Sequence, residues 1–177
     1  VTPLLSKSDC QRLVDLAVDY TNHDGRGWQL DRHKDYKTTD VDVAVVGGQL
    51  FSECNRHLKD VILPTLAQLF HFPVQDLATE DLFLAKYSAA KDQQRSLPPH
   101  RDDSELSFVI TLNDTFQGGG TRFIDSNTTV APETPPGTGV LFCGRLLHEG
   151  VEVIDGTRYI LAGFVRVYPS TPDSQNT

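Results

Sequence analysis

Apolar residues recur at helical spacing through the first part of the chain. Between Ser8 and Tyr20 they return every three or four positions, behind a serine that can cap the first turn. A second apolar stripe runs from Gln49 to Leu63. Pro64 should end or kink that helix, and it can open a short third helix through Phe70. The pattern therefore predicts a helical first part of the chain.

From Leu82 onward the pattern changes to short β-branched or aromatic runs, separated by clusters of Gly, Pro, Asn and Asp. Within one run, Phe108, Ile110 and Leu112 alternate with more polar positions, which predicts an inward-facing strand surface. Helices followed by many short strands favour an α+β fold, with helices packed on a β-sandwich or jelly roll. The expected strands are Leu82–Tyr87, Glu105–Asn113, Thr121–Asp125, Gly139–Phe142 and Thr157–Val167.

Length and composition fit one globular domain. The chain has 177 residues, of which 38% are hydrophobic, and we expect a single domain over 1–168, with helical support in 1–75 and a strand core in 82–168. Residues 169–177 are rich in Ser, Thr and Pro and are expected to form a flexible tail. The net charge of −8, without a basic stripe, argues against a nucleic-acid partner.

No apolar run is long enough to span a bilayer. The chain starts at Val1 and contains no methionine, so we expect a domain cut from a longer protein. The compartment, either intracellular or a secretory lumen, and the oligomeric state stay open.

A possible metal site stands out among the polar residues. His100 and Asp102 are two residues apart, so both side chains lie on one face of an extended strand, and His148 offers a third ligand. Two histidines and one carboxylate that leave three metal positions open are typical of non-haem Fe(II) oxygenases. Asp103 is a rival ligand that would point to the opposite face. The other histidines, taken as surface or packing residues, are His23, His33, His57 and His71.

Arg158 strengthens the case for an oxygenase site. Asp155-Gly156 is a hairpin signal, and a three-residue loop or bulge that pairs Ile154 with Arg158 would bring His148 and Arg158 to one face. A buried guanidinium needs an anionic partner and suits a carboxylate. A dicarboxylate that chelates iron at one end and meets Arg158 at the other is 2-oxoglutarate. An internal salt bridge to an Asp or Glu is an equally good explanation of this residue alone.

Five motifs follow one another in the second half of the chain: Ser96-Leu-Pro-Pro-His-Arg-Asp102, Val109-Ile-Thr-Leu-Asn113, Gly118-Gly-Gly-Thr-Arg-Phe123, Gly144-Arg-Leu-Leu-His-Glu-Gly150 and Gly156-Thr-Arg-Tyr-Ile160. In this order they resemble the prolyl 4-hydroxylase superfamily of Fe(II)- and 2-oxoglutarate-dependent oxygenases, and most closely the catalytic domain of procollagen lysyl hydroxylases. The resemblance covers about residues 82–167. It implies a double-stranded β-helix (jelly-roll, cupin-like) core with supporting amino-terminal helices.

The resemblance also implies roles for single residues. His100, Asp102 and His148 would bind Fe(II), and Arg158 would grip the distal carboxylate of 2-oxoglutarate. Tyr87 and Thr121 match positions near that carboxylate. From the residues alone, Tyr87 is a core residue and Gly118–Gly120 a bulge or turn.

Departures from the prolyl hydroxylase pattern leave the substrate open. Prolyl hydroxylases usually have Lys at the position of Arg158 and Tyr at the position of Leu97, and both changes favour the lysyl-hydroxylase-like branch. Lysyl hydroxylases usually have Cys at the position of Thr121, which points the other way.

The implied activity is a dioxygenase reaction that uses O₂, with ascorbate as a further candidate cofactor. It would hydroxylate a prolyl or lysyl residue of a protein or peptide and release succinate and CO₂. Three alternatives remain: a hydroxylase of a free amino acid or other small molecule, a catalytically idle binding module, and a cupin-type metalloenzyme that does not use 2-oxoglutarate.

Several residues outside the motifs could border the site. Phe164 could wall the cosubstrate pocket or simply pack in the core. Trp28 could edge a substrate groove, although a surface-packed indole is the more ordinary explanation. The stretches Asp92–Leu97 and Asp24–Thr39 look like loops and could flank the site as flaps.

Overall fold

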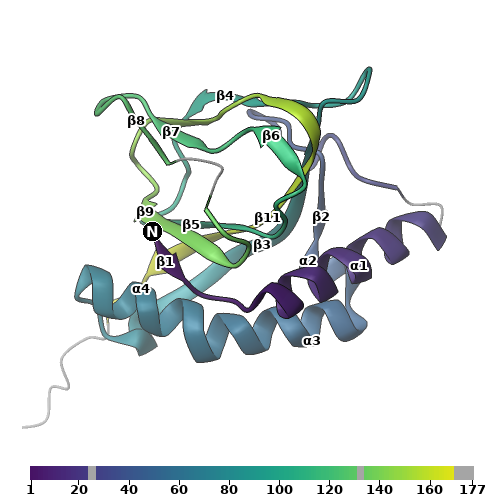
Figure 1. Cartoon of the computed structure of the whole chain (residues 1–177). Helices are drawn as coiled ribbons and strands as arrows, with labels where there is room; N and C mark the ends of the chain where they lie inside the picture. Colours follow the sequence, from purple (N-terminus) through teal and green to yellow (C-terminus); the bar gives the residue numbers. More distant parts are fainter. Residues whose placement is uncertain (24–26, 131–133, 170–177) are drawn as a thin grey trace, which may run out of the picture.

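The computed structural model describes residues 1–23, 27–130 and 134–169, and within these two β-sheets form a barrel-like body with helices beneath it (Figure 1). The predicted α+β jelly roll is confirmed. Most of the tail predicted for 169–177, and the start of the predicted flap at Asp24, lie outside the described residues.

The larger sheet has seven strands, in the order β1-β9-β5-β11-β3-β2, with β6 paired to β11. Its centre is the long antiparallel pair of β3 and β11, in which Tyr87 lies opposite Arg158. The prediction missed the short strands β1, β2 and β6 and began β3 five residues late. The strands are β1 (Thr2–Pro3), β2 (Asp40–Asp42), β3 (Leu77–Ser88), β5 (Leu106–Thr111), β6 (Phe116–Gly118), β9 (Thr138–Cys143) and β11 (Val153–Val167).

The smaller sheet has four very short strands, in the order β4-β10-β7-β8. His100 at the end of β4 lies opposite His148 at the start of β10, and at the other end of β10 Gly150 pairs with Thr121 of β7. The two histidines therefore lie at one end of the strands of this sheet, and Thr121 lies at the other end. Its strands are β4 (Leu97–His100), β7 (Thr121–Phe123), β8 (Thr128–Val130) and β10 (His148–Gly150).

The predicted helices are present as α1 (Lys7–His23), α3 (Gly48–His57) and α4 (Leu63–Phe70), with a four-residue helix α2 (Val43–Val46) before α3. A π-helical turn, η1 (Leu58–Ile62), joins α3 to α4, and a 3-10 turn, η2 (Val74–Asp76), follows α4. The π turn has a local cause: Pro64 has no N–H and its ring would crowd an α-helical carbonyl, so the N–H of Leu63 bonds instead to the carbonyl of Leu58. No helix of the described residues is long and apolar enough to cross a membrane.

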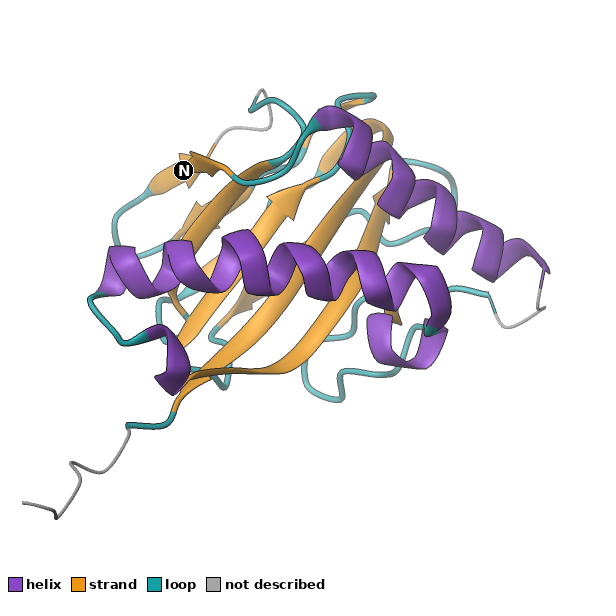
Figure 2. Cartoon of the chain, turned by 90° about the horizontal axis from the view of Figure 1, so that it is seen from below, coloured by secondary structure: helices purple, strands orange, loops and turns teal. Residues whose placement is uncertain are grey.

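The helices cover one face of the larger sheet (Figure 2), and the main core lies between these helices and the sheet. Phe108, Ile110 and Leu112 are almost fully buried, as predicted, but they belong to this helix-facing core. A second, smaller core lies on the opposite face of the sheet and includes Phe83, Tyr87, Leu97, Ile160 and Ala162. The larger sheet is therefore apolar on both faces, and its second face is the one that meets the smaller sheet.

The predicted hairpin at Asp155-Gly156 is wrong. β11 runs without a turn through both residues, and they pair with β6, opposite Gln117 and Phe116. His148 and Arg158 lie in different sheets, because the chain crosses from β10 to β11 at residues 151–152. Gly156 has φ +74°, and a Cβ there would lie 2.4 Å from the carbonyl oxygen of Thr115. The glycine thus permits close approach of two strands rather than a reversal of the chain.

Candidate active site

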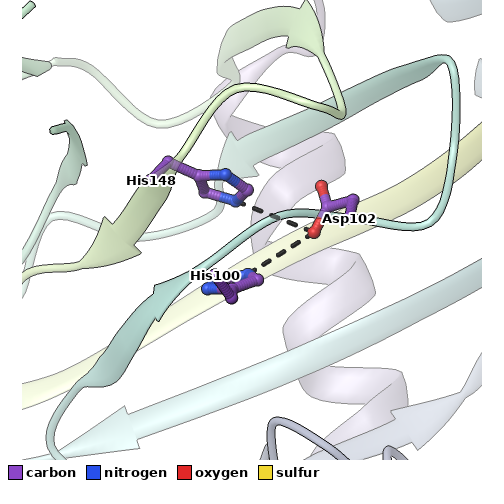
Figure 3. Close-up of side chains that lie close together, drawn as sticks. All are labelled: His100, Asp102 and His148. Carbon is purple, nitrogen blue, oxygen red and sulfur yellow. Dashed lines mark ion pairs between the residues drawn. The ribbon is translucent and has the colours of Figure 1, made fainter. Parts of the chain in front are cut away.

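Two histidines and one aspartate converge at one edge of the smaller sheet (Figure 3). One ligand atom from each of His100, Asp102 and His148 lies within 4.8 Å of the others. Nε2 of His100 is 3.4 Å and Nε2 of His148 is 3.8 Å from Asp102 Oδ1. All three residues are buried, which is unusual for such polar groups unless they have a common partner. The set provides two imidazoles and one carboxylate, the donors that suit Fe(II).

The backbone fixes the tautomer of both histidines. Nδ1 of His100 lies 2.8 Å from the carbonyl oxygen of Pro98, and Nδ1 of His148 lies 2.9 Å from that of Leu146. A carbonyl only accepts hydrogen bonds, so each Nδ1 carries the proton and each Nε2 keeps its lone pair. Burial also lowers the pKa of His148, which favours the neutral ring that a metal needs. Both Nε2 atoms are therefore presented as ligands before any metal binds.

Asp102 reaches this centre from just beyond the end of β4, not from the strand itself. Its backbone N–H donates to the carbonyl oxygen of Gly144 at 2.9 Å, which anchors the turn. A Cβ on Gly144 would lie 2.5 Å from the backbone oxygen of Ser104, so the close approach of residue 144 to Ser104 requires glycine. The neighbouring Asp103 is 85% exposed in its side chain and pairs with Arg145 and Arg166. The sequence-based preference for Asp102 over Asp103 therefore agrees with the geometry.

Arg158 lies on the larger sheet, is 4% exposed, and has no carboxylate partner among the described residues. Its Nη1 donates a 3.3 Å hydrogen bond to the carbonyl oxygen of Gly120, while its buried Nε has no partner. Burial lowers the pKa of the guanidinium to about 10. The alternative from the sequence, an internal salt bridge of Arg158 to an Asp or Glu, is not found among the residues that the structure describes. An orphaned buried cation fits an anionic ligand, and a carboxylate has the right shape.

Three consecutive glycines precede Thr121, and the second and third of them lie beside this guanidinium. Gly118, Gly119 and Gly120 all have positive φ, of +75°, +72° and +102°. A Cβ on Gly119 would lie 3.0 Å from Cδ of Arg158, so only glycine lets the backbone pass this close. Thr121, which begins β7 directly after them, is also buried. The segment joins β6 to β7 and brings Thr121 to the pocket, and the bulge or turn expected from the sequence stays a prediction.

Tyr87 is the strand partner of Arg158 and is buried beside it. Burial raises the pKa of the phenol to about 12, and the nearby charge of Arg158 opposes that rise. The hydroxyl therefore stays protonated and can donate a hydrogen bond at neutral pH. Tyr87 and Arg158 therefore form a pair of neighbouring hydrogen-bond donors.

One pocket, with a volume of about 350 Å³, joins these groups. Its walls include the three possible metal ligands as well as Tyr87, Thr121 and Arg158, so the structure brings together every predicted site residue. Phe164 also lines it and packs edge-on against Phe83, with ring centroids 5.6 Å apart. Trp28 does not line the pocket; it packs on Tyr159 with Lys86 over its ring.

Sequence reasoning missed one face of this pocket. His33, taken as a surface or packing residue, lines the pocket, stacks on Phe83 with ring centroids 4.8 Å apart, and has Nε2 3.4 Å from an oxygen of Asp40. Arg32 and Tyr36 line the same face. Only the general expectation of a flap in Asp24–Thr39 pointed to this face, because no local motif marks these residues.

Comparison with known proteins gives relatives with a specific activity. The chain is 32% identical to a multifunctional procollagen lysine hydroxylase and glycosyltransferase of Caenorhabditis elegans and to the human procollagen-lysine,2-oxoglutarate 5-dioxygenase 2, over 92% of this chain in each case. It is 40% identical to a Drosophila melanogaster procollagen-lysine,2-oxoglutarate 5-dioxygenase over 54% of this chain. The chain spans 23% of the length of the first two relatives and 13% of the third. No family model matches the chain.

Solved structures confirm the fold. A viral collagen prolyl hydroxylase from Paramecium bursaria Chlorella virus-1, in complex with 2-oxoglutarate, superposes with a TM-score of 0.65 at 18% identity, covering 96% of this chain and 94% of that one. A Pseudomonas putida prolyl-4-hydroxylase gives 0.64 at 18% identity, covering 96% and 91%. An α-ketoglutarate-dependent epimerase from nogalamycin biosynthesis gives 0.66 at 15% identity, covering 100% and 85%. Since an epimerase shares the fold with hydroxylases, the fold alone does not determine the reaction.

Proposed function

We propose that this chain, which belongs to the prolyl 4-hydroxylase superfamily of Fe(II)- and 2-oxoglutarate-dependent oxygenases, hydroxylates a lysyl or prolyl residue of a protein substrate. One observation supports the proposal most strongly. The buried guanidinium of Arg158, which has no carboxylate partner among the described residues, shares a pocket with a buried triad of two histidines and one aspartate. A dicarboxylate that is also a metal chelator satisfies both at once. We assign the oxygenase domain to residues 1–168.

Each residue of the pocket has a separate task in this proposal. His100, Asp102 and His148 would hold Fe(II) through one face, leaving the other positions to the reactants. Arg158 would bind the distal carboxylate of 2-oxoglutarate through its guanidinium, and Tyr87 would donate a hydrogen bond to the same carboxylate. Thr121, at the end of the glycine turn, would pack or hydrogen-bond beside it. These contacts orient the cosubstrate and keep water away from its charged end.

The bound iron and 2-oxoglutarate together supply the oxidising chemistry: O₂ is consumed, 2-oxoglutarate loses CO₂ to become succinate, and one oxygen atom enters a C–H bond of the substrate. The protein contributes orientation and exclusion. The apolar side chains Phe83, Ile160, Ala162 and Phe164 line the pocket and present no easily oxidised polar group to the centre. Ascorbate would serve to keep the iron reduced.

Two considerations favour a lysyl residue over a prolyl one as the target. Procollagen lysine hydroxylases match this chain over 92% of its length. Arg158 and Leu97 also match their pattern rather than that of prolyl hydroxylases, although Thr121 does not.

The test is succinate formation from 2-oxoglutarate with Fe(II) and ascorbate in air. Wild type is compared with His148→Ala and with the matched control His23→Ala, which removes an exposed histidine at the end of α1. We expect turnover in wild type and control and none in His148→Ala. Absence of succinate from wild type, together with absence of iron binding, would refute the proposal.

The substrate is then identified by mass spectrometry with collagen-like peptides that contain Lys or Pro, and with free lysine and proline. An added mass of one oxygen on lysine in a peptide supports the assignment. Hydroxylation of the free amino acids alone would replace it with a small-molecule activity.

A further inference from the structure

One wall of the pocket is built by a loop rather than by the barrel. Six residues that precede β2 line the pocket, and they come from a stretch without helix or strand. Within it, the ring of Tyr36 lies 5.0 Å from the ring of His100, and the ring of His33 packs on Phe83 and Phe164. This wall therefore contacts the proposed metal site through Tyr36. The six residues, here called the loop wall, are Arg32, His33, Lys34, Asp35, Tyr36 and Thr38.

The beginning of the loop wall is fixed by charge. Nε of Arg32 lies 2.6 Å from a carboxylate oxygen of Asp40, and its Nη1 lies 2.9 Å from Asp81. Asp40 is fully buried in β2, and Asp81 belongs to β3. Arg32 is thus tied to the larger sheet. At the end of the loop wall, the hydroxyl of Thr38 donates to Asp40, and the carbonyl oxygen of Thr39 accepts from the N–H of Lys86 in β3 at 2.8 Å.

The side chain of Gln94 adds four hydrogen bonds, three of them to that end. Its Oε1 accepts hydrogen bonds from the N–H of Thr39 at 2.7 Å and from the hydroxyl of Thr39 at 3.0 Å. Its Nε2 donates to the carbonyl oxygen of Lys37 at 2.8 Å and to that of Ser96 at 3.0 Å. The carboxamide therefore uses both donors and both acceptor sites, and it spans the two segments that the sequence suggested as flaps.

Gln94 is itself placed by the sheet and by the metal-binding strand. Its backbone carbonyl accepts from the N–H of Ser88 at the end of β3, at 2.8 Å. Three residues later β4 begins at Leu97 and leads directly to His100. The side chain thus joins the loop wall to the segment that carries the first proposed iron ligand.

We infer that Gln94 is a positioning residue, which sets the loop wall against the metal site and so defines the space open to the substrate side chain. The inference rests on the proposed function, since it assigns the loop wall to the substrate. Gln94 touches none of the groups assigned to iron or 2-oxoglutarate. Its loss should therefore weaken substrate binding and coupling while it spares cosubstrate binding.

The variants are Gln94→Ala, which removes all four bonds, and Gln94→Glu, which keeps the acceptors but sets a carboxylate against two carbonyl oxygens. Gln93→Ala is the matched control, because Gln93 is the adjacent residue of the same type and is exposed. Hydrogen exchange of the backbone amides in 32–39 is measured without substrate. Peptide KM, cosubstrate KM in the absence of peptide, and succinate formed per hydroxylated product are measured with Fe(II).

We expect faster amide exchange in 32–39, by about tenfold, in both Gln94 variants and no change in Gln93→Ala. Peptide KM should rise about threefold to tenfold, as the loss of one or two hydrogen bonds predicts. More succinate should form per hydroxylated product, and the cosubstrate KM should stay the same. If Gln94 only stabilised the fold, its loss would lower kcat and thermal stability without raising peptide KM selectively over cosubstrate KM.

Two results overturn the inference. Unchanged exchange in both Gln94 variants shows that other contacts hold the loop wall, whatever the activity of the protein. Faster exchange with unchanged peptide KM and coupling shows that the loop wall does not contact the substrate. Failure of the proposed function looks different, because wild type itself then forms no succinate, and the exchange measurement still decides whether Gln94 positions the loop.

Discussion

Replacing Arg158 by methionine should separate two effects of the guanidinium, its effect on folding stability and its effect on 2-oxoglutarate binding. Methionine keeps most of the stem length and removes the charge. In the ligand-free protein Arg158 is 4% exposed, and burial lowers its pKa to about 10. That lowering corresponds to a cost on the order of 3 kcal/mol for the charged form. The unpartnered Nε is part of this cost.

Two opposite effects follow from this cost. Without ligand, Arg158→Met should be as stable as wild type or more stable, by up to about 3 kcal/mol. At roughly 2–4 °C per kcal/mol for a chain of this size, the melting temperature should rise by up to about 6–12 °C. With ligand, loss of a buried ion pair should weaken 2-oxoglutarate binding by at least about 2 kcal/mol, or roughly 30-fold. Most substitutions of a buried residue destabilise the fold, so a gain in stability would be a specific signature.

The assay is thermal unfolding with Mn²⁺ in place of Fe(II), with and without 2-oxoglutarate, supported by calorimetric titration of the cosubstrate. Arg166→Met is the control, because Arg166 lies on the same strand but is paired at the surface with Glu80. It should leave 2-oxoglutarate binding intact. Wild-type affinity of Arg158→Met for 2-oxoglutarate, or unfolding several degrees earlier without ligand, would contradict this role of Arg158.

Three further changes test other parts of the argument. Gly119→Ala should destabilise the protein by about 1–3 kcal/mol and weaken 2-oxoglutarate binding, because its Cβ would lie 3.0 Å from Arg158 in a backbone with φ +72°. Urea unfolding measures the stability and titration measures the binding; unchanged values of both would contradict this packing. Tyr87→Phe should raise the cosubstrate KM about twofold to tenfold and leave Mn²⁺ affinity unchanged, since one hydrogen bond is lost; an unchanged KM removes Tyr87 from the cosubstrate site. His57 is buried and its pKa is lowered by burial and by Arg56, so the unfolded chain binds its proton more tightly, and stability should fall as the pH drops below about 6.5. His57→Gln should flatten the part of this loss seen in unfolding curves from about pH 5 to 8, and an identical pH profile would show that His57 is not its source.

The sequence predicted those parts of the structure that depend on local pattern. Helical periodicity located α1, α3 and α4, and β-branched runs located the long strands. The three proposed iron ligands and Arg158 came from residue type and motif order, and the structure brings them into one pocket.

The failures share one physical cause, which is contact between segments far apart in sequence. Asp155-Gly156 has the composition of a hairpin, yet Gly156 is needed because β6 passes over it. The short strands β4 and β10 have only four and three residues, and pairing with each other defines them more than propensity does. His33 carries no local signal, since its partners Phe83 and Asp40 are joined to it only by the fold.

The division of the site between two unequal sheets affects how firmly each half is held. Arg158 stands on a strand of 15 residues at the centre of the larger sheet, whereas the four strands of the smaller sheet have three or four residues each. Strands this short gain little from pairing, so local unfolding should begin in the smaller sheet. Metal and cosubstrate would then act as a clamp that supplies part of its folding free energy. In the apo protein, local unfolding would therefore be more frequent around the three proposed iron ligands than around Arg158.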